Sequence, residues 1–197
     1  MAKKNVWVCL GDIFEGGAHL TVLPASAKGT ISSSCRRWVT LFNLVAPPFD
    51  KKAVLGELSD IFTFPNPTVS AHYCYAYSVF NDRSTSEALT EIGRALGRIT
   101  QEDSNIQIIQ SPLLGTGAGG LSNDDAAKAL IAGFVEASHP NALLCIFVSD
   151  SERQKNLQKH LESVFSQVLD GISMEVSYMG VGFDIKKALK AFLDALK

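Results

Sequence analysis

The sequence has little net charge and no apolar run long enough to span a bilayer. Its 197 residues carry a formal charge of −2, whereas nucleic-acid-binding domains typically carry a strongly basic face. No apolar stretch approaches the roughly 20 residues that cross a membrane, and the N-terminus lacks the form of a signal peptide. We therefore expect a protein that binds neither membranes nor nucleic acid.

The sequence also lacks the spacings that hold metal ions or build common nucleophiles. Its four cysteines form no C-x-x-C pair, and its four histidines show no H-x-x-x-H spacing. No G-x-S-x-G is present, so a nucleophile elbow is unsupported. We predict no metal site and no bound cofactor. Unpaired cysteines in apolar runs indicate a reducing compartment, and hence a cytoplasmic protein.

The composition is that of an ordinary globular protein. Hydrophobic residues make up 46% and charged residues 19%, enough apolar material to bury a core. The length suits one domain, and we find neither a linker nor an internal repeat. We predict a single domain over residues 1–197.

Apolar periodicity predicts alternating strands and helices. The predicted strands are 6–10, 19–23 (ended by Pro24), 71–80, 106–110, 142–149 and 172–178. The predicted helices are 35–44, a short one within 51–62, one carrying Leu89, Ile92, Leu96 and Ile99, then 124–138, 151–169 and 185–196. Alternation of this kind from residue 71 onward favours a largely parallel sheet covered on both faces.

Two of these elements present distinctive faces. Tyr73, Tyr75 and Tyr77 alternate at strand spacing, so all three should face one side of the sheet and pack beneath a helix. The terminal helix 185–196 carries an apolar stripe. This stripe fits either a cover for the sheet or the interface of a homo-oligomer.

A glycine-rich loop separates the strand 106–110 from the helix 124–138. Residues 111–121 read S-P-L-L-G-T-G-A-G-G-L. Glycines let consecutive N–H groups cradle phosphate, and the following helix adds its positive end. The alternative is a tight structural turn, although such a turn rarely needs four glycines. Asp124 and Asp125 would repel a phosphate unless their side chains point away from it.

The same loop also matches a dinucleotide fingerprint. Gly115, Gly117 and Gly120 satisfy G-x-G-x-x-G, and Asp150 ends the next predicted strand. The match begins after 114 residues, which leaves too little chain for the rest of a six-stranded dinucleotide sheet. A dinucleotide-dependent oxidoreductase is therefore the weakest of the alternatives.

Two motifs and the order of elements resemble a macro domain. Gly11-Asp12-Ile13 follows the first strand, and residues 111–117 are similar to the family's phosphate loop S-P-x-x-G-T-G. The resemblance implies a three-layer α/β/α sandwich with a mixed, largely parallel sheet. It also implies a binding module for ADP-ribose or a related nucleotide.

Carried over motif by motif, the resemblance implies a role for each segment. Asp12 would accept a hydrogen bond from the adenine amino group, although a turn residue is the alternative there. The N–H of Ile13 would meet a ring nitrogen, and Ser149 and Asp150 would lie near the adenine. The diphosphate would be held by the loop residues Gly115, Thr116, Gly117, Ala118, Gly119 and Gly120.

The sequence departs from the family in the loop after the second strand. Many macro domains carry N-A-A-N there, with an asparagine at the distal ribose, whereas this chain reads Leu-Pro-Ala-Ser ending at Ser26. The glycine run that follows is reduced to Lys28, Gly29 and Thr30. Lys28 would meet a phosphate as a point charge, or it is a solvated loop lysine. 

These departures favour binding, or the sensing of a cyclic or conjugated nucleotide, over turnover. The alternative function is an ADP-ribosyl hydrolase, for which the sequence assigns no catalytic residue.

Overall fold

The structure is a computed structural model and describes residues 5–15, 17–67, 69–80 and 84–157. Its strands are β1 (Asn5–Leu10), β2 (Ala18–Ser26), β3 (Phe62–Thr63), β4 (Ser70–Val79), β5 (Ile108–Pro112) and β6 (Leu143–Val148). Its helices are the 3-10 helix η1 (Ile13–Glu15), α1 (Ser33–Leu41), α2 (Thr85–Glu102) and α3 (Asn123–Ala137). A further helix begins at Ser151 and is described as far as Leu157.

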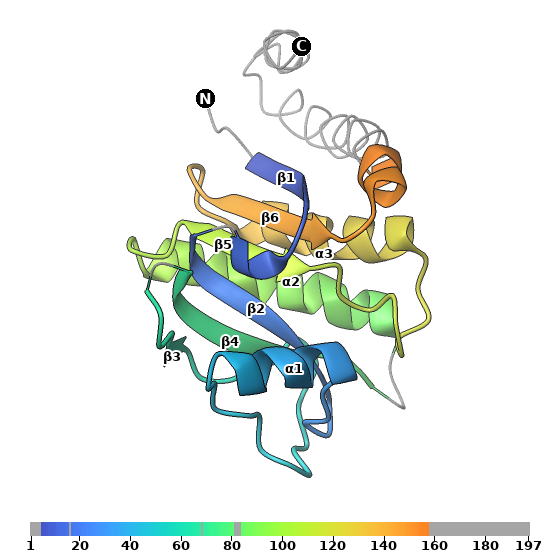
Figure 1. The fold of residues 1–197 in the computed structure, drawn as a ribbon. Helices are drawn as coiled ribbons and strands as arrows, with labels where there is room; N and C mark the ends of the chain where they lie inside the picture. The colour runs from blue at the N-terminus through green and yellow to red at the C-terminus, as the bar shows by residue number, and fades with distance from the viewer. Residues whose placement is uncertain (1–4, 16, 68, 81–83, 158–197) are drawn as a thin grey trace, which may run out of the picture. The chain divides into compact units, whose positions relative to one another are not determined.

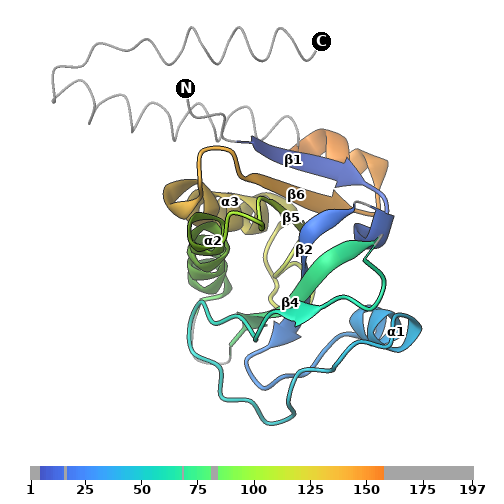
Figure 2. The same ribbon diagram turned by 90° about the vertical axis from the view of Figure 1, so that its left-hand side faces the viewer.

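The strands form one mixed sheet in the order β1-β6-β5-β2-β4-β3. Every pairing is parallel except that of the short β3 with β4. Helices α2 and α3 cover one face of the sheet and α1 covers the other (Figures 1 and 2). The predicted three-layer arrangement is therefore confirmed. The order differs from the 3-2-1-4-5-6 order of the dinucleotide fold, which removes the support for an oxidoreductase.

Helices α2 and α3 lie unusually close to each other. Leu89, Ile92 and Leu96, predicted to form the apolar stripe of α2, are fully buried. A Cβ built on Gly93 would lie 2.2 Å from the carbonyl oxygen of Leu130, and one on Gly133 would lie 1.9 Å from that of Thr90. The two backbones therefore approach each other at positions where only glycine fits.

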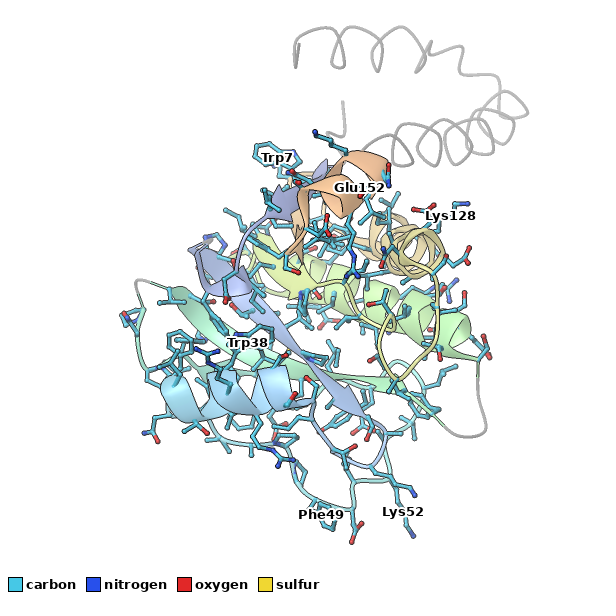
Figure 3. The ribbon with its side chains drawn as sticks, turned by 45° about the vertical axis from the view of Figure 1, so that its right-hand side comes forward. Trp7, Trp38, Phe49, Lys52, Lys128 and Glu152 are labelled. Atoms are coloured by element: carbon cyan, nitrogen blue, oxygen red, sulfur yellow. The ribbon has the colours of Figure 1, made fainter. Side chains whose placement is uncertain are left out.

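The opposite face carries the three tyrosines predicted to share one side. Tyr73, Tyr75 and Tyr77 are at most 1% exposed. The Tyr73 hydroxyl accepts a hydrogen bond from the N–H of Val45 at 2.8 Å, and the Tyr75 hydroxyl donates to the carbonyl oxygen of Val45 at 2.9 Å. Two buried phenols thus fix the segment that follows α1. Further along that segment, Phe49 and Lys52 project outward, whereas Trp38 of α1 lies over the sheet (Figure 3).

The prediction of a short helix within residues 51–62 is wrong. Gly56 adopts φ 75° within a single turn closed by the N–H of Glu57 on the carbonyl oxygen of Val54, and the residues after it bond to the edge of β4. The N–H of Ser59 donates to the carbonyl oxygen of Tyr75 at 2.8 Å, and Leu58 forms an antiparallel bridge with Ala76. An exposed strand edge supplied partners that a helical turn would otherwise have provided.

Two predicted boundaries also change. Strand β2 continues through Pro24 to Ser26 instead of ending at the proline. Strand β2 pairs with β5 only at Leu20 and Thr21. At Pro24, which has no N–H, no hydrogen bond to β5 is therefore lost. Helix α1, predicted to reach Leu44, ends at Leu41, because Asn43 takes the left-handed conformation that terminates helices.

The predicted strand 172–178, the terminal helix 185–196 and the second half of the helix 151–169 lie outside the described residues. A single domain over residues 1–197 therefore remains a prediction. Within the described ranges, no helix combines the length and apolarity needed to cross a membrane.

Candidate functional site

Four loops meet at the carboxyl edge of the sheet. Because β1, β6, β5 and β2 are parallel neighbours, the loops that follow them emerge on the same side. The N–H of Gly11 donates to the carbonyl oxygen of Val148 at 3.1 Å, which joins the first of these loops to the last. The structure therefore brings every predicted site segment to one edge.

The glycine-rich loop after β5 is anchored at both ends. Leu114 is 2% exposed, and the Thr116 hydroxyl donates to the carbonyl oxygen of Leu113 at 3.2 Å. At the far end, the N–H of Leu121 donates to the carbonyl oxygen of Gly115 at 3.2 Å. Gly115 and Gly120 adopt φ values of 79° and 69°, a conformation that favours glycine. These contacts fix the path of the loop between its two ends.

Between these anchors, a row of backbone donors has no partner. Among the residues that the structure describes, the N–H groups of Thr116, Gly117, Ala118 and Gly119 donate no hydrogen bond. Gly117 and Ala118 are exposed, and a Cβ on Gly117 would meet nothing within 4 Å. Unpartnered consecutive N–H groups of this kind suit an anion.

Thr85, the first residue of α2, holds this row in place and was not among the predicted site residues. Its hydroxyl donates to the carbonyl oxygen of Gly119 at 3.1 Å across 34 residues of chain. A Cβ on Gly119 would lie 2.7 Å from the Thr85 methyl carbon and 2.5 Å from the carbonyl oxygen of Gly115. No local signal in the sequence links two residues so far apart.

The helix after this loop begins at Asn123, one residue before the predicted start, and is capped by Ser122. The Ser122 hydroxyl accepts a hydrogen bond from the N–H of Asp125 at 3.1 Å and donates to its carboxylate at 2.7 Å. The carboxylate of Asp125 is therefore engaged by its own cap. The positive end of α3 lies directly after the row of unpartnered donors.

The loop after β2 closes on itself through hydrogen bonds between its own residues. The N–H of Ser26 donates to the carbonyl oxygen of Thr30, and the N–H of Gly29 donates to that of Ser26, each at 2.8 Å. The Ser26 Oγ also accepts from the N–H groups of Lys28 and Thr30, at 3.3 and 3.1 Å.

Neighbouring segments hold this loop from behind. A Cβ on Gly29 would lie 2.0 Å from the carbonyl oxygen of Pro48, so the chain after α1 packs directly on it. The N–H of Ala53 donates to the carbonyl oxygen of Ala27 at 3.0 Å, and the N–H of Ala27 donates to that of Val79 at 2.8 Å. The loop is therefore fixed on both sides. Lys28 and Thr30 remain exposed.

The loop after β1 places Asp12 at the surface and Ile13 inside. Asp12 Oδ1 accepts a hydrogen bond from the N–H of Phe14 at 3.1 Å, which is the turn role weighed from the sequence. Its exposure leaves the side chain accessible. Ile13 is 3% exposed, and the Phe14 ring packs on those of Trp38 and Phe42. A buried isoleucine and an aromatic cluster thus hold the Asp12 turn at this edge.

Asp150 has a structural role that the sequence analysis missed. Its Oδ1 accepts hydrogen bonds from the N–H groups of Glu152 at 2.7 Å and Arg153 at 3.2 Å. This is the N-cap of the helix that begins at Ser151. The signal was present, because an Asp directly before a helical run is a cap signature.

Cys9 and Cys145 lie on the adjacent strands β1 and β6, two residue pairs apart in register. The Cys145 thiol lowers the pKa of Cys9 to about 7, while burial raises the pKa of Cys35 and of Cys74 to about 12. We expect alkylation of Cys9 by iodoacetamide to accelerate as the pH rises through about 7, because the thiolate is the nucleophile. Mass spectrometry of the labelled protein measures this.

The matched control for this prediction is Cys145→Ala, which removes the neighbouring thiol. It should move the acceleration of Cys9 labelling to higher pH. Equal labelling rates for Cys9, Cys35 and Cys74 in the folded protein would contradict the prediction.

The described residues contain no group of three or more His, Cys, Asp or Glu side chains that could hold a metal ion.

Comparison with known proteins agrees with this architecture. No protein-family model and no curated protein sequence matches the chain. Among solved structures, the Oceanobacillus iheyensis macrodomain with ADP superposes with a TM-score of 0.62 at 14% identity, covering 85% of this chain and 95% of that one.

A second macrodomain, that of Mycobacterium tuberculosis DarG, superposes with a TM-score of 0.54 at 15% identity, covering 72% of this chain and 96% of that one. A variant of the Oceanobacillus iheyensis macrodomain with ADPR gives a TM-score of 0.59 at 15% identity, covering 84% and 97%. The sheet order, the three layers and these likenesses agree: the chain has the macrodomain fold.

Proposed function

We propose that this protein binds ADP-ribose or a related adenine nucleotide and holds the diphosphate on the glycine-rich loop. One observation carries the proposal: four consecutive N–H groups, from Thr116 to Gly119, have no partner among the described residues, at the carboxyl edge of the parallel strands. Hydrogen bonds to a charged group contribute about 1.5–3 kcal/mol each. The helix that follows adds a favourable dipole.

The remaining assignments follow the order of the loops along this edge. Asp12 would accept from the adenine amino group, and the N–H of Ile13 would meet a ring nitrogen. Ser149 and Asp150, which follow the adjacent β6, would flank the adenine. The macrodomain of Oceanobacillus iheyensis with ADP supports this class of ligand by likeness of fold.

Binding is favoured over hydrolysis by the contacts of the polar side chains at this edge. A hydrolase needs a group that positions or activates water near the distal ribose. Asp125 and Asp150 serve as caps, and Ser26 is engaged within its own loop. We propose a cytoplasmic protein, in keeping with the free state of Cys9, Cys35, Cys74 and Cys145.

Calorimetric titration of the full chain tests the proposal. We expect ADP-ribose or ADP to bind with a Kd at the micromolar level or tighter, about −8 kcal/mol. Adenosine, which keeps the base and ribose but lacks the diphosphate, should bind at least tenfold more weakly. Absence of heat with every adenine diphosphate would overturn the function, and binding of adenosine equal to that of ADP would overturn the loop assignment.

A further inference from the structure

The hydrogen bonds of the Ser26 and Thr30 hydroxyls determine which donors the loop after β2 has available for a ligand. A hydroxyl donates one hydrogen bond and accepts two. The Ser26 Oγ accepts from the N–H groups of Lys28 and Thr30, so its hydrogen must go to the Thr30 Oγ1, which lies 2.5 Å away. Ser26 is therefore saturated, whereas the hydroxyl hydrogen of Thr30 is left to donate outward.

The two loops consequently present mainly donors. Lys28 and Thr30 are exposed and contribute an ammonium and a hydroxyl hydrogen. The glycine-rich loop contributes the four unpartnered N–H groups described above. Within that loop, the carbonyl oxygens of Gly115, Gly117 and Gly119 already accept hydrogen bonds from Leu121, Gly120 and Thr85. Such a set matches phosphate oxygens, which only accept, better than the hydroxyls of a sugar, which also donate.

The topology places both loops at the same edge of the sheet, after two neighbouring parallel strands. Strands β2 and β5 pair only at Leu20 with Ile109 and at Thr21 with Gln110. Beyond these pairs, β2 stays paired with β4 as far as Ser26, and β5 stays paired with β6 as far as Pro112. A phosphate bound between the two loops would thus be reached by donors from both sides.

The loop after β2 is also fixed in this conformation. Pro48 packs on Gly29, and Ala27 is hydrogen-bonded to both Val79 and Ala53. Turning its N–H groups toward a second ribose would break several of these bonds at once. Its contribution to binding is therefore restricted to the side chains of Lys28 and Thr30.

Resting on the proposed function, we infer that the site prefers a nucleotide that ends in a free terminal phosphate, such as ADP, over one that continues into a second ribose. Lys28 and Thr30 are then its specificity-determining residues. A terminal phosphate carries more negative charge than a bridging one near neutral pH, since its second pKa is about 6. The additional charge meets the Lys28 ammonium directly.

Titration of the full chain with ADP and with ADP-ribose tests this preference. We expect ADP to bind about tenfold more tightly at pH 8, a difference of about 1.4 kcal/mol. The ratio should shrink as the pH falls to 5.5 and the terminal phosphate is protonated. Lys28→Met should weaken ADP about tenfold and ADP-ribose less than threefold.

Arg98→Met is the matched control, because it also removes one exposed positive charge. Arg98 lies 13 residues after Thr85, the residue of α2 that touches the glycine-rich loop, and hence about 20 Å further along the helix. It should leave the ratio unchanged. Equal or tighter binding of ADP-ribose, or an equal effect of Lys28→Met on both ligands, would overturn the preference alone. Failure of both nucleotides to bind would instead overturn the proposed function.

Discussion

Replacing Gly117 by phenylalanine is expected to weaken nucleotide binding at least a hundredfold without unfolding the protein. Gly117 is exposed, and a Cβ there meets nothing within 4 Å, so the fold has room for a side chain. The ring would nevertheless lie over the row of unpartnered N–H groups. Loss of two charge-assisted hydrogen bonds, each about 1.5–3 kcal/mol, accounts for a hundredfold change, about 2.7 kcal/mol.

Calorimetry with ADP measures this loss, and the melting temperature reports on the fold. Ser104→Phe is the control, because Ser104 is exposed in the turn between α2 and β5, at the opposite edge of the sheet. It adds the same ring and should leave binding unchanged. If Gly117→Phe retained its affinity at an unchanged melting temperature, the phosphate would have to bind elsewhere.

Replacing Gly133 by alanine should destabilise the protein by about 3 kcal/mol. A Gly-to-Ala change inside a helix normally stabilises it by about 1 kcal/mol. Here we expect the opposite, a loss of stability. The added Cβ would lie 1.9 Å from the carbonyl oxygen of Thr90, and a backbone atom of α2 cannot turn aside as a side chain can. Overpacking of this kind costs about 1–3 kcal/mol, occasionally more.

Thermal unfolding followed by circular dichroism measures the effect, which corresponds to a fall in Tm of roughly 6–12 °C. Ala132→Gly is the matched control on the exposed side of the same helix. It should cost only about 1 kcal/mol through helix propensity. An unchanged or higher Tm for Gly133→Ala would show that α2 and α3 do not approach each other as closely as the structure places them.

Local patterns were enough to predict most of the described elements. The α2 stripe and the shared face of the three tyrosines both follow from residues within a few positions of one another. Helical and strand periodicities and side-chain caps are short-range effects. The wrong helix within residues 51–62 is the instructive exception, since its backbone bonds to β4, a partner that no local pattern reveals.

By itself, the sequence determined that a glycine-rich loop stands between a strand and a capped helix, and that its residues suit an anion. Only the tertiary structure decided what faces that loop. Parallel pairing of β2 with β5 brings Lys28 and Thr30 to the same edge as Gly117, and the hydrogen bonds of Ser26 close the loop after β2. The physical reason is that residue types determine which donors exist, whereas strand order and packing determine which of them remain unpartnered.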